Sequence, residues 1–149
     1  MVKVAQVRRW VFRRHSNPWS AWTRWLSTPL VLVPIWNRDW RQGALVAAWL
    51  AANPVVFPEP RDDKAFATRA MLGEELWVVR RPRDAAMASN AAGMALGVLA
   101  VVAARRRRLG LTVVATVAEM ALLMFYWRQM AAYYDENHGT GNNDAAEVA

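Results

Sequence analysis

The 149-residue chain contains no cysteine and only two histidines, His15 and His138. The absence of cysteine excludes disulfides, thiolate zinc sites and cysteine nucleophiles. No HxxH, HxxxH or ExxH pair occurs, and a second axial ligand for haem is missing. Phosphate-binding glycine loops, nucleophile elbows and dinucleotide-binding fingerprints are absent as well. The sequence therefore predicts no metal and no cofactor.

Acidic residues are also scarce: 12 Asp and Glu stand against 19 Lys and Arg, which gives a net charge of +7. Hydrophobic residues make up 55% of the chain, yet the mean hydropathy is only +0.01, because basic residues offset long apolar runs. No residue between 85 and 104 is charged. The charge alone would also suit a nucleic-acid binder, but this distribution favours membrane spans with basic flanks. Nucleic acid is therefore not expected as a partner.

The apolar segments predict an all-α polytopic membrane protein with four transmembrane helices. Segments of about 17–21 residues, at ~1.5 Å per residue, just cover a hydrocarbon core of about 30 Å. A charged linker with one apolar face predicts an interfacial helix between the second and third spans. A single membrane domain is predicted over residues 1–134, and the polar residues 135–149 are predicted to form a disordered tail. The spans are predicted at about 18–36, 41–57, 84–104 and 109–127, and the interfacial helix at about 62–79.

The first predicted span begins in a polar and aromatic segment. Asn17 followed by Pro18 predicts a helix N-cap with proline in the first turn. Three tryptophans at three-residue spacing suit the headgroup layer of a bilayer, and Arg24 lies near enough to the start to reach that layer. Two prolines inside the span predict a kink or a broken helix. These residues are Trp19, Trp22 and Trp25, and Pro29 and Pro34.

Basic residues set the expected partners and orientation. Residues 1–16 carry five of them and predict an anchor on anionic lipid headgroups. With both termini inside, the inner segments hold thirteen basic residues and the outer loops six. That bias predicts a multi-pass protein of the cell membrane with cytoplasmic termini. The loop Arg105–Arg108 is an exception to this bias, because this orientation requires its four arginines to cross the bilayer.

Small residues recur every four positions in the third predicted span. Ser89, Gly93 and Gly97 share one helix face and include a GxxxG pattern. Such a face lets another helix approach closely. The partner is either a helix of the same chain or a second copy, which leaves a homo-oligomer open.

Glu119 is the one acidic residue deep inside an apolar segment. An ionised group there costs roughly 2.5–3.5 kcal/mol unless it is protonated or paired. Counting outward from the arginine loop places Glu119 level with Gly93, one turn from Asn90, so a hydrogen bond between Glu119 and Asn90 is geometrically feasible. The two residues are the candidates for proton binding, as in proton-coupled transport. The alternative is a hydrogen-bonded glutamate that fixes helix packing.

His15, Glu74 and Glu75 share one face of the predicted topology and are the candidates for catalysis. One histidine and two carboxylates can perform general acid–base chemistry or hold a metal. The alternative is that His15 forms a hydrogen bond near the start of the first helix, while Glu74 and Glu75 pair with neighbouring arginines. The pattern assigns none of the three to a reaction.

Three short motifs resemble an uncharacterised family of small prokaryotic membrane proteins. The second and third motifs are Asn53-Pro54-x-x-Phe57-Pro58-x-Pro60 and Leu72-Gly73-Glu74. The family is a domain of unknown function, so the resemblance implies a membrane protein and no activity. Four spans with one membrane glutamate also resemble the small multidrug-resistance transporters, whose glutamate lies in the first span rather than the fourth. The first motif comprises His15, Asn17, Pro18, Ser20, Trp22, Thr23 and Arg24.

Three functions are compatible with these features. The first is a small integral membrane protein that acts as a non-enzymatic structural or interaction subunit. The second is a proton-coupled carrier of small molecules that uses Glu119. The third is a membrane enzyme that acts on lipid through His15 and Glu74.

Overall fold

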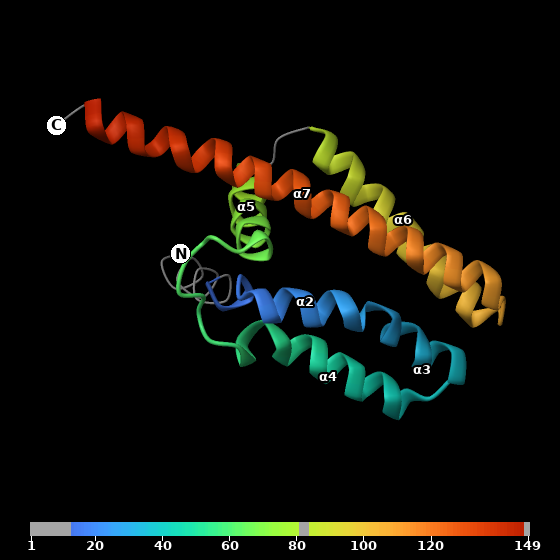
Figure 1. Cartoon of the computed structure of the whole chain (residues 1–149). Helices are drawn as coiled ribbons and strands as arrows, with labels where there is room; N and C mark the ends of the chain where they lie inside the picture. Colours follow the sequence, from blue (N-terminus) through green and yellow to red (C-terminus); the bar gives the residue numbers. More distant parts are fainter. Residues whose placement is uncertain (1–12, 81–83, 148–149) are drawn as a thin grey trace.

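The computed structural model describes residues 13–80 and 84–147, and their side chains up to Asn137. All regular structure in these ranges is helical, which confirms the all-α prediction. Figure 1 shows two hairpins side by side, with α5 crossing beneath α7 at one end. The hairpins turn at the opposite end, so both turns lie close together. The elements are α2 (Pro18–Ser27), η1 (Thr28–Val31), α3 (Leu32–Asn37), α4 (Trp40–Val56), α5 (Phe66–Arg80), α6 (Ala85–Arg105) and α7 (Leu109–Glu147).

The first hairpin starts at the predicted cap. The Asn17 side-chain oxygen accepts the N–H of Trp19 at 2.9 Å, and Pro18 occupies the first turn of α2. The predicted break is confirmed, because α2 ends at Ser27 and a short 3₁₀ helix containing Pro29 leads into α3. Proline has no N–H to donate, so the α-helical ladder cannot run unbroken through this segment.

A tight turn joins α3 to α4. Arg38 adopts a left-handed conformation with φ of 55°, which closes α3. Asp39 then caps α4, since its Oδ1 accepts the N–H of Arg41 at 2.8 Å. The helix continues to Val56 with Pro54 in its last turn.

The predicted interfacial helix corresponds to α5, which starts at Phe66 rather than near residue 62. One face of α5 is buried against α7, with Met71 and Trp77 in the core beside Tyr126 and Met130. The two helices touch through their backbones, because a Cβ on Gly73 would lie 1.9 Å from the carbonyl oxygen of Met130. The helix α5 is therefore an integral part of the helical core.

The second hairpin, α6–α7, has an interface of small residues. Asp84 caps α6 by accepting the N–H of Met87 at 3.1 Å. Thr112 and Thr116 donate their hydroxyls to carbonyls one turn back on α7, so both are buried without an unsatisfied donor. Small side chains let the two helices lie close together. The buried alanines of this hairpin include Ala100, Ala103 and Ala104 on α6 and Ala115 on α7.

Four spans were predicted, but only two helical segments in the described residues are long and apolar enough to cross a membrane. These are Ala85–Arg105 and Leu109–Asn137. The segment predicted as the first span is divided among α2, η1 and α3 by its prolines, and α4 is only 17 residues long. Helix length, rather than hydrophobicity alone, therefore separates the second hairpin from the first.

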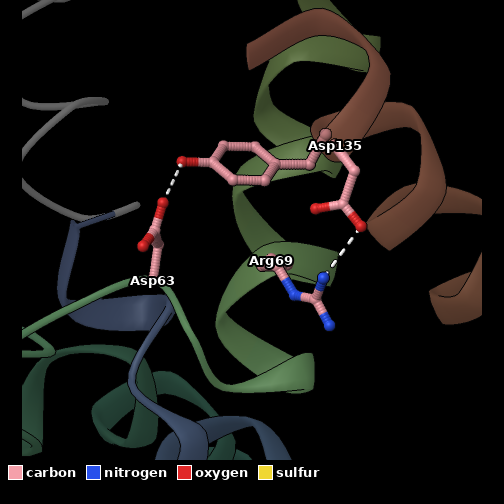
Figure 2. A network of polar contacts seen from close by, with 4 residues as sticks. Asp63, Arg69 and Asp135 are labelled. Carbon is pink, nitrogen blue, oxygen red and sulfur yellow. Dashed lines mark hydrogen bonds and ion pairs between the residues drawn. The ribbon is translucent and has the colours of Figure 1, made fainter. Parts of the chain in front are cut away.

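The tail predicted for residues 135–149 overlaps the C-terminal part of α7. The helix α7 continues without a break to Glu147. Its polar continuation is tied to α5, since Asp135 forms an ion pair with Arg69 at 2.8 Å (Figure 2). Asn137 also accepts a hydrogen bond from Arg80. Tyr134 also donates its hydroxyl to Asp63 at 2.9 Å. Composition alone missed these contacts because their partners lie about 60 residues earlier in the chain.

Two features named from the sequence lie outside the described part of the structure. Residues 1–12 of the lipid anchor predicted for residues 1–16 are one, and the side chain of His138 is the other.

Candidate functional site

The first and second sequence motifs meet at a buried amide. Asn53 of α4 is fully buried, and its Oδ1 accepts the hydroxyl of Ser20 at 2.9 Å. Its Nδ2 donates to Oγ1 of Thr23 at 2.9 Å. Both hydroxyls belong to α2, so one asparagine fixes the spacing and rotation of α2 against α4.

The start of α2 also satisfies backbone carbonyls at the end of α4. The last carbonyls of any helix lack intrahelical donors and need other partners. Ser20 Oγ approaches the carbonyl of Asn53 at 3.3 Å, and Arg14 donates to the carbonyl of Val55 at 3.2 Å. Asn17 Nδ2 donates to the carbonyl of Pro58 at 2.9 Å. The polar residues of the first motif thus form hydrogen bonds with backbone carbonyls of the proline-rich second motif, where the chain leaves α4.

Ionisable groups from three helices gather beside this junction. Nη1 of Arg24 lies 2.7 Å from Nδ1 of His15 and 2.9 Å from Nε2 of the same ring. Nη2 of Arg24 contacts the sulfur of Met71 at 3.5 Å. Glu74, on α5, accepts the hydroxyl of Tyr126 from α7 at 3.3 Å. Arg24 is also close enough for its charge to act on the Glu74 carboxyl. We call His15, Arg24, Glu74 and Tyr126 the polar cluster.

Burial controls protonation in the polar cluster. It lowers the pKa of His15 to about 4, and the charge of Arg24 acts in the same direction. His15 is therefore neutral near pH 7, and a neutral ring nitrogen can accept a hydrogen bond from the Arg24 guanidinium. Burial also raises the pKa of Glu74, while the Tyr126 hydrogen bond and the Arg24 charge oppose that rise. The cluster can hold a proton, and it links α2, α5 and α7.

The tryptophans of the first motif do not share one environment. Trp19 is 71% exposed, as expected for a ring in a headgroup layer. Trp22 makes edge contacts with Trp25 and with Trp127 of α7. Nε1 of Trp25 donates to the carbonyl of Met120 at 3.2 Å. Trp22 and Trp25 therefore attach α2 to α7.

Glu119 lies between the two hairpins and lines two cavities. The larger, of about 370 Å³, opens toward Thr28 and Thr116, and the smaller, of about 150 Å³, also includes Asn90. Oε1 of Glu119 would be 2.7 Å from a Cβ placed on Gly97. The feasible hydrogen bond to Asn90 is not formed between these two described residues. The arginine turn puts Glu119 level with Gly97, one helical turn beyond the level counted from the sequence.

The three small residues predicted to form a packing face on α6 behave differently. Gly97 is in close contact with Glu119, whereas a Cβ on Gly93 would meet nothing within 4 Å. Ser89 donates its hydroxyl to the carbonyl of Ala85 within its own helix. Only one end of the predicted face therefore meets α7 closely.

The described residues contain no group of three histidine, cysteine, aspartate or glutamate side chains able to hold a metal ion.

A family of unknown function, DUF6653, matches residues 1–149. The chain belongs to the DUF6653 family. This confirms the family of unknown function predicted by resemblance. No curated protein and no solved structure matches the chain.

In this DUF6653 protein, the first motif is brought together with Glu74, one of the two glutamates predicted as candidates. Glu75 is half-buried on the same helix. Sequence reasoning missed the roles of Asn53, Gly73 and Tyr126 as contacts between helices. A glycine within a helical pattern either destabilises its helix or allows another helix to approach closely. Only the residues that surround it in the fold distinguish the two cases.

Proposed function

We propose that this DUF6653 protein is a multi-pass protein of the cell membrane that acts as a non-enzymatic structural or interaction subunit. The observation that carries the proposal is the exposed apolar surface of α6 and α7. Only 11% of the apolar window of α6 and 22% of that of α7 are buried within the chain. A core helix of a water-soluble protein buries its apolar face, and exposed apolar patches of this extent mark a membrane or partner surface.

The distribution of side chains supports the same conclusion. Large apolar residues point outward on both helices, including Met94, Val98 and Val114, each more than 60% exposed. Many buried positions hold small or polar side chains such as Ser20 and Asn53, while larger apolar side chains are buried where α5 meets α7. This arrangement is typical of helices in lipid, where small residues and interhelical hydrogen bonds hold helices together.

The first hairpin extends the apolar surface. Leu26, Leu45 and Val56 are each more than 60% exposed, and the hairpin lies alongside α6–α7 (Figure 1). The 17 residues of α4 span about 26 Å, close to the ~30 Å of a hydrocarbon core. The proposal therefore embeds both hairpins in one bilayer. It places the termini on the cytoplasmic side, where thirteen of the nineteen basic residues would lie.

A structural role is supported by the way the motif residues are used. His15 is held by Arg24, Glu74 by Tyr126, and Asn53 by two hydroxyls of α2. Each contact joins two segments of the chain. Their combined effect is a fixed scaffold with an apolar exterior, which suits a subunit that presents a constant surface to lipid or to a partner.

The absence of cysteine allows a direct test in membrane vesicles. Ala85→Cys and Arg106→Cys place single thiols at opposite ends of α6, both at exposed positions. A membrane-impermeant maleimide should label them from opposite sides of sealed vesicles. Equal labelling after detergent treatment is the control for intrinsic reactivity. Labelling of both thiols from one side would exclude a membrane-crossing α6.

One observation favours a second function, a proton-coupled carrier. The Glu119 carboxyl lines a cavity of about 370 Å³ between the hairpins and has no hydrogen-bond partner among the described residues. A carboxyl in such a position can exchange a proton with a transported cation.

The carrier function is tested with ethidium uptake into proteoliposomes under an imposed pH gradient. Glu119→Gln should abolish gradient-driven uptake, because the amide cannot release a proton. Glu136→Gln, at an exposed position of the same helix, is the matched control and should transport normally. Unchanged uptake by Glu119→Gln would remove the carrier function.

A further inference from the structure

The end of the molecule where both hairpins turn is strongly basic. It carries Arg38 and Arg41 at one turn and Arg105–Arg108 at the other. The acidic residue between α3 and α4 is Asp39, and its Oδ1 is occupied by the N–H groups of Arg41 and Gln42. Among the described residues, none of the six arginines forms an ion pair. Six positive charges therefore face outward, and Asp39 is the acidic residue beside them at the first turn.

Aromatic rings hold two of these arginines at the turns. The Arg107 guanidinium lies 5.4 Å from the ring centre of Trp36, and that of Arg41 lies 5.8 Å from the ring centre of Trp40. The first contact joins the two hairpins. Tryptophan and arginine together at a helix end are typical of the headgroup layer of a bilayer.

A groove of about 590 Å³ opens at this basic end, between α3 and α4. Arg38 and Arg105, from different hairpins, lie at its charged end. Gly43 contributes no side chain to its wall, and Pro34 faces that glycine across the groove. Asp39 and Trp40 also line the groove, and the rest of the wall is apolar and includes Val31, Ile35, Val46, Ala47 and Leu50.

We propose that this groove binds one anionic phospholipid, with its phosphate on Arg38 and Arg105 and an acyl chain along the apolar wall of α4. Guanidinium groups bind phosphate oxygens through paired, charge-assisted hydrogen bonds. The proposal rests on the membrane location proposed above, because only a bilayer delivers this ligand. It goes further by naming a specific lipid site and its residues.

Charge and wall chemistry together select this occupant. A zwitterionic lipid has a cationic group beside its phosphate, and the charged lining of two arginines and one carboxylate is net positive and disfavours that group. Free inorganic phosphate would gain nothing from the apolar wall. An anionic phospholipid matches both parts, since its phosphate suits the arginines and its acyl chain suits the apolar wall.

The test uses the full chain purified in detergent, with native mass spectrometry as the readout. Phosphatidylglycerol and phosphatidylcholine of identical acyl chains are added at equal concentration. We expect one phosphatidylglycerol to be retained in preference to phosphatidylcholine. The double variant Arg38→Gln/Arg105→Gln should weaken this retention by about tenfold or more, as expected for losing hydrogen bonds to a charged group.

A matched variant separates a defined site from general attraction. Arg106→Gln/Arg108→Gln removes the same charge from the same end, but neither residue lines the groove. It should retain phosphatidylglycerol nearly as the unchanged chain does. Equal losses in the two double variants would overturn the site in favour of diffuse electrostatic attraction.

The apolar part of the groove is tested without changing any charge. Ala47→Phe should fill the groove and reduce retention, whereas Ala48→Phe, also exposed but outside the groove, should not. Far-UV circular dichroism verifies that each variant folds. If an arginine variant does not fold, the Ala47→Phe and Ala48→Phe pair tests the lipid site in its place. Equal retention in the Ala47 and Ala48 variants, or displacement of lipid by inorganic phosphate alone, would overturn the proposal.

The labelling of Ala85→Cys and Arg106→Cys tests membrane crossing independently.

Discussion

At the scale of single residues, polar side chains inside this protein act mainly as contacts between helices. Asn53 is the clearest case, because all of its side-chain hydrogen bonds reach α2. Asn17 both caps α2 and donates to Pro58 beyond the end of α4. Such buried amides are costly unless every donor and acceptor is satisfied. Here satisfaction requires two segments more than 30 residues apart to meet.

His15 gives the fold a predictable pH dependence. The pKa of His15 is 6.5 in an unfolded chain and about 4 in the folded protein. Between these values the unfolded state binds a proton that the folded state does not, so the free energy of unfolding falls as the pH falls through that window. The slope is about 1.4 kcal/mol per pH unit. Above pH 6.5 the residue is neutral in both states and contributes no slope.

Replacing this histidine should therefore flatten the acid limb of the stability curve. His15→Gln is expected to lose less thermal stability than the unchanged chain between pH 6.5 and 4.5, measured as Tm in detergent micelles. Glu74 acts in the opposite sense, because its raised pKa favours the folded state at low pH and that contribution is lost as the pH rises. His138→Gln is the control for the second histidine. If Tm falls equally with pH in His15→Gln and in the unchanged chain, this pH dependence does not come from His15.

At the scale of elements, the crossing of α5 and α7 determines whether the polar cluster can form. Glu74 follows Gly73, and it is the close approach at Gly73 that brings the Glu74 carboxyl to the hydroxyl of Tyr126. Helices separated by ordinary side chains lie 8–10 Å apart, whereas glycine allows backbone contact.

Gly73→Ala should separate α5 from α7. Its Cβ would be 1.9 Å from the Met130 carbonyl oxygen, so the helices must move apart, at a cost of about 1–3 kcal/mol or more. Gly110→Ala is the control, since nothing lies within 4 Å of its Cβ position and alanine favours a helix. Thermal unfolding in micelles should show a lower Tm for the first variant only. A Gly73→Ala protein as stable as the unchanged chain would show that this crossing is not tight.

At the scale of the whole molecule, the two hairpins run together and turn at the same end. The contact of Arg107 with Trp36 places both turns at one level. Asn37→Cys in the first turn should therefore be labelled from the same side of the membrane as Arg106→Cys in the second. Lys64→Cys, before α5, should be labelled from the other side. Labelling of Asn37→Cys from the side of Lys64→Cys would mean that the first hairpin does not cross with the second.

The sequence by itself determined the all-helical class, the start of the first helix and the proline break. Asn17 marks the start of α2 because capping depends on neighbouring residues, and Pro29 breaks a helix whatever surrounds it. The candidate site could be predicted in part, since the motifs contain His15, Arg24 and Glu74 without indicating that they meet.

Only the tertiary structure decided which of these residues meet. The Ser20–Asn53 bond joins residues 33 positions apart, and Gly73 meets Met130 across a larger gap. The same holds for Glu119, which lies opposite Gly97 because of where the arginine turn sets the register of α7. Hydrophobic periodicity shows which face of a helix is apolar, but not how far a partner helix is shifted along it. The contacts of Tyr134 and Asp135 on α7 are a tertiary result as well, because their partners Asp63 and Arg69 come from the region of α5.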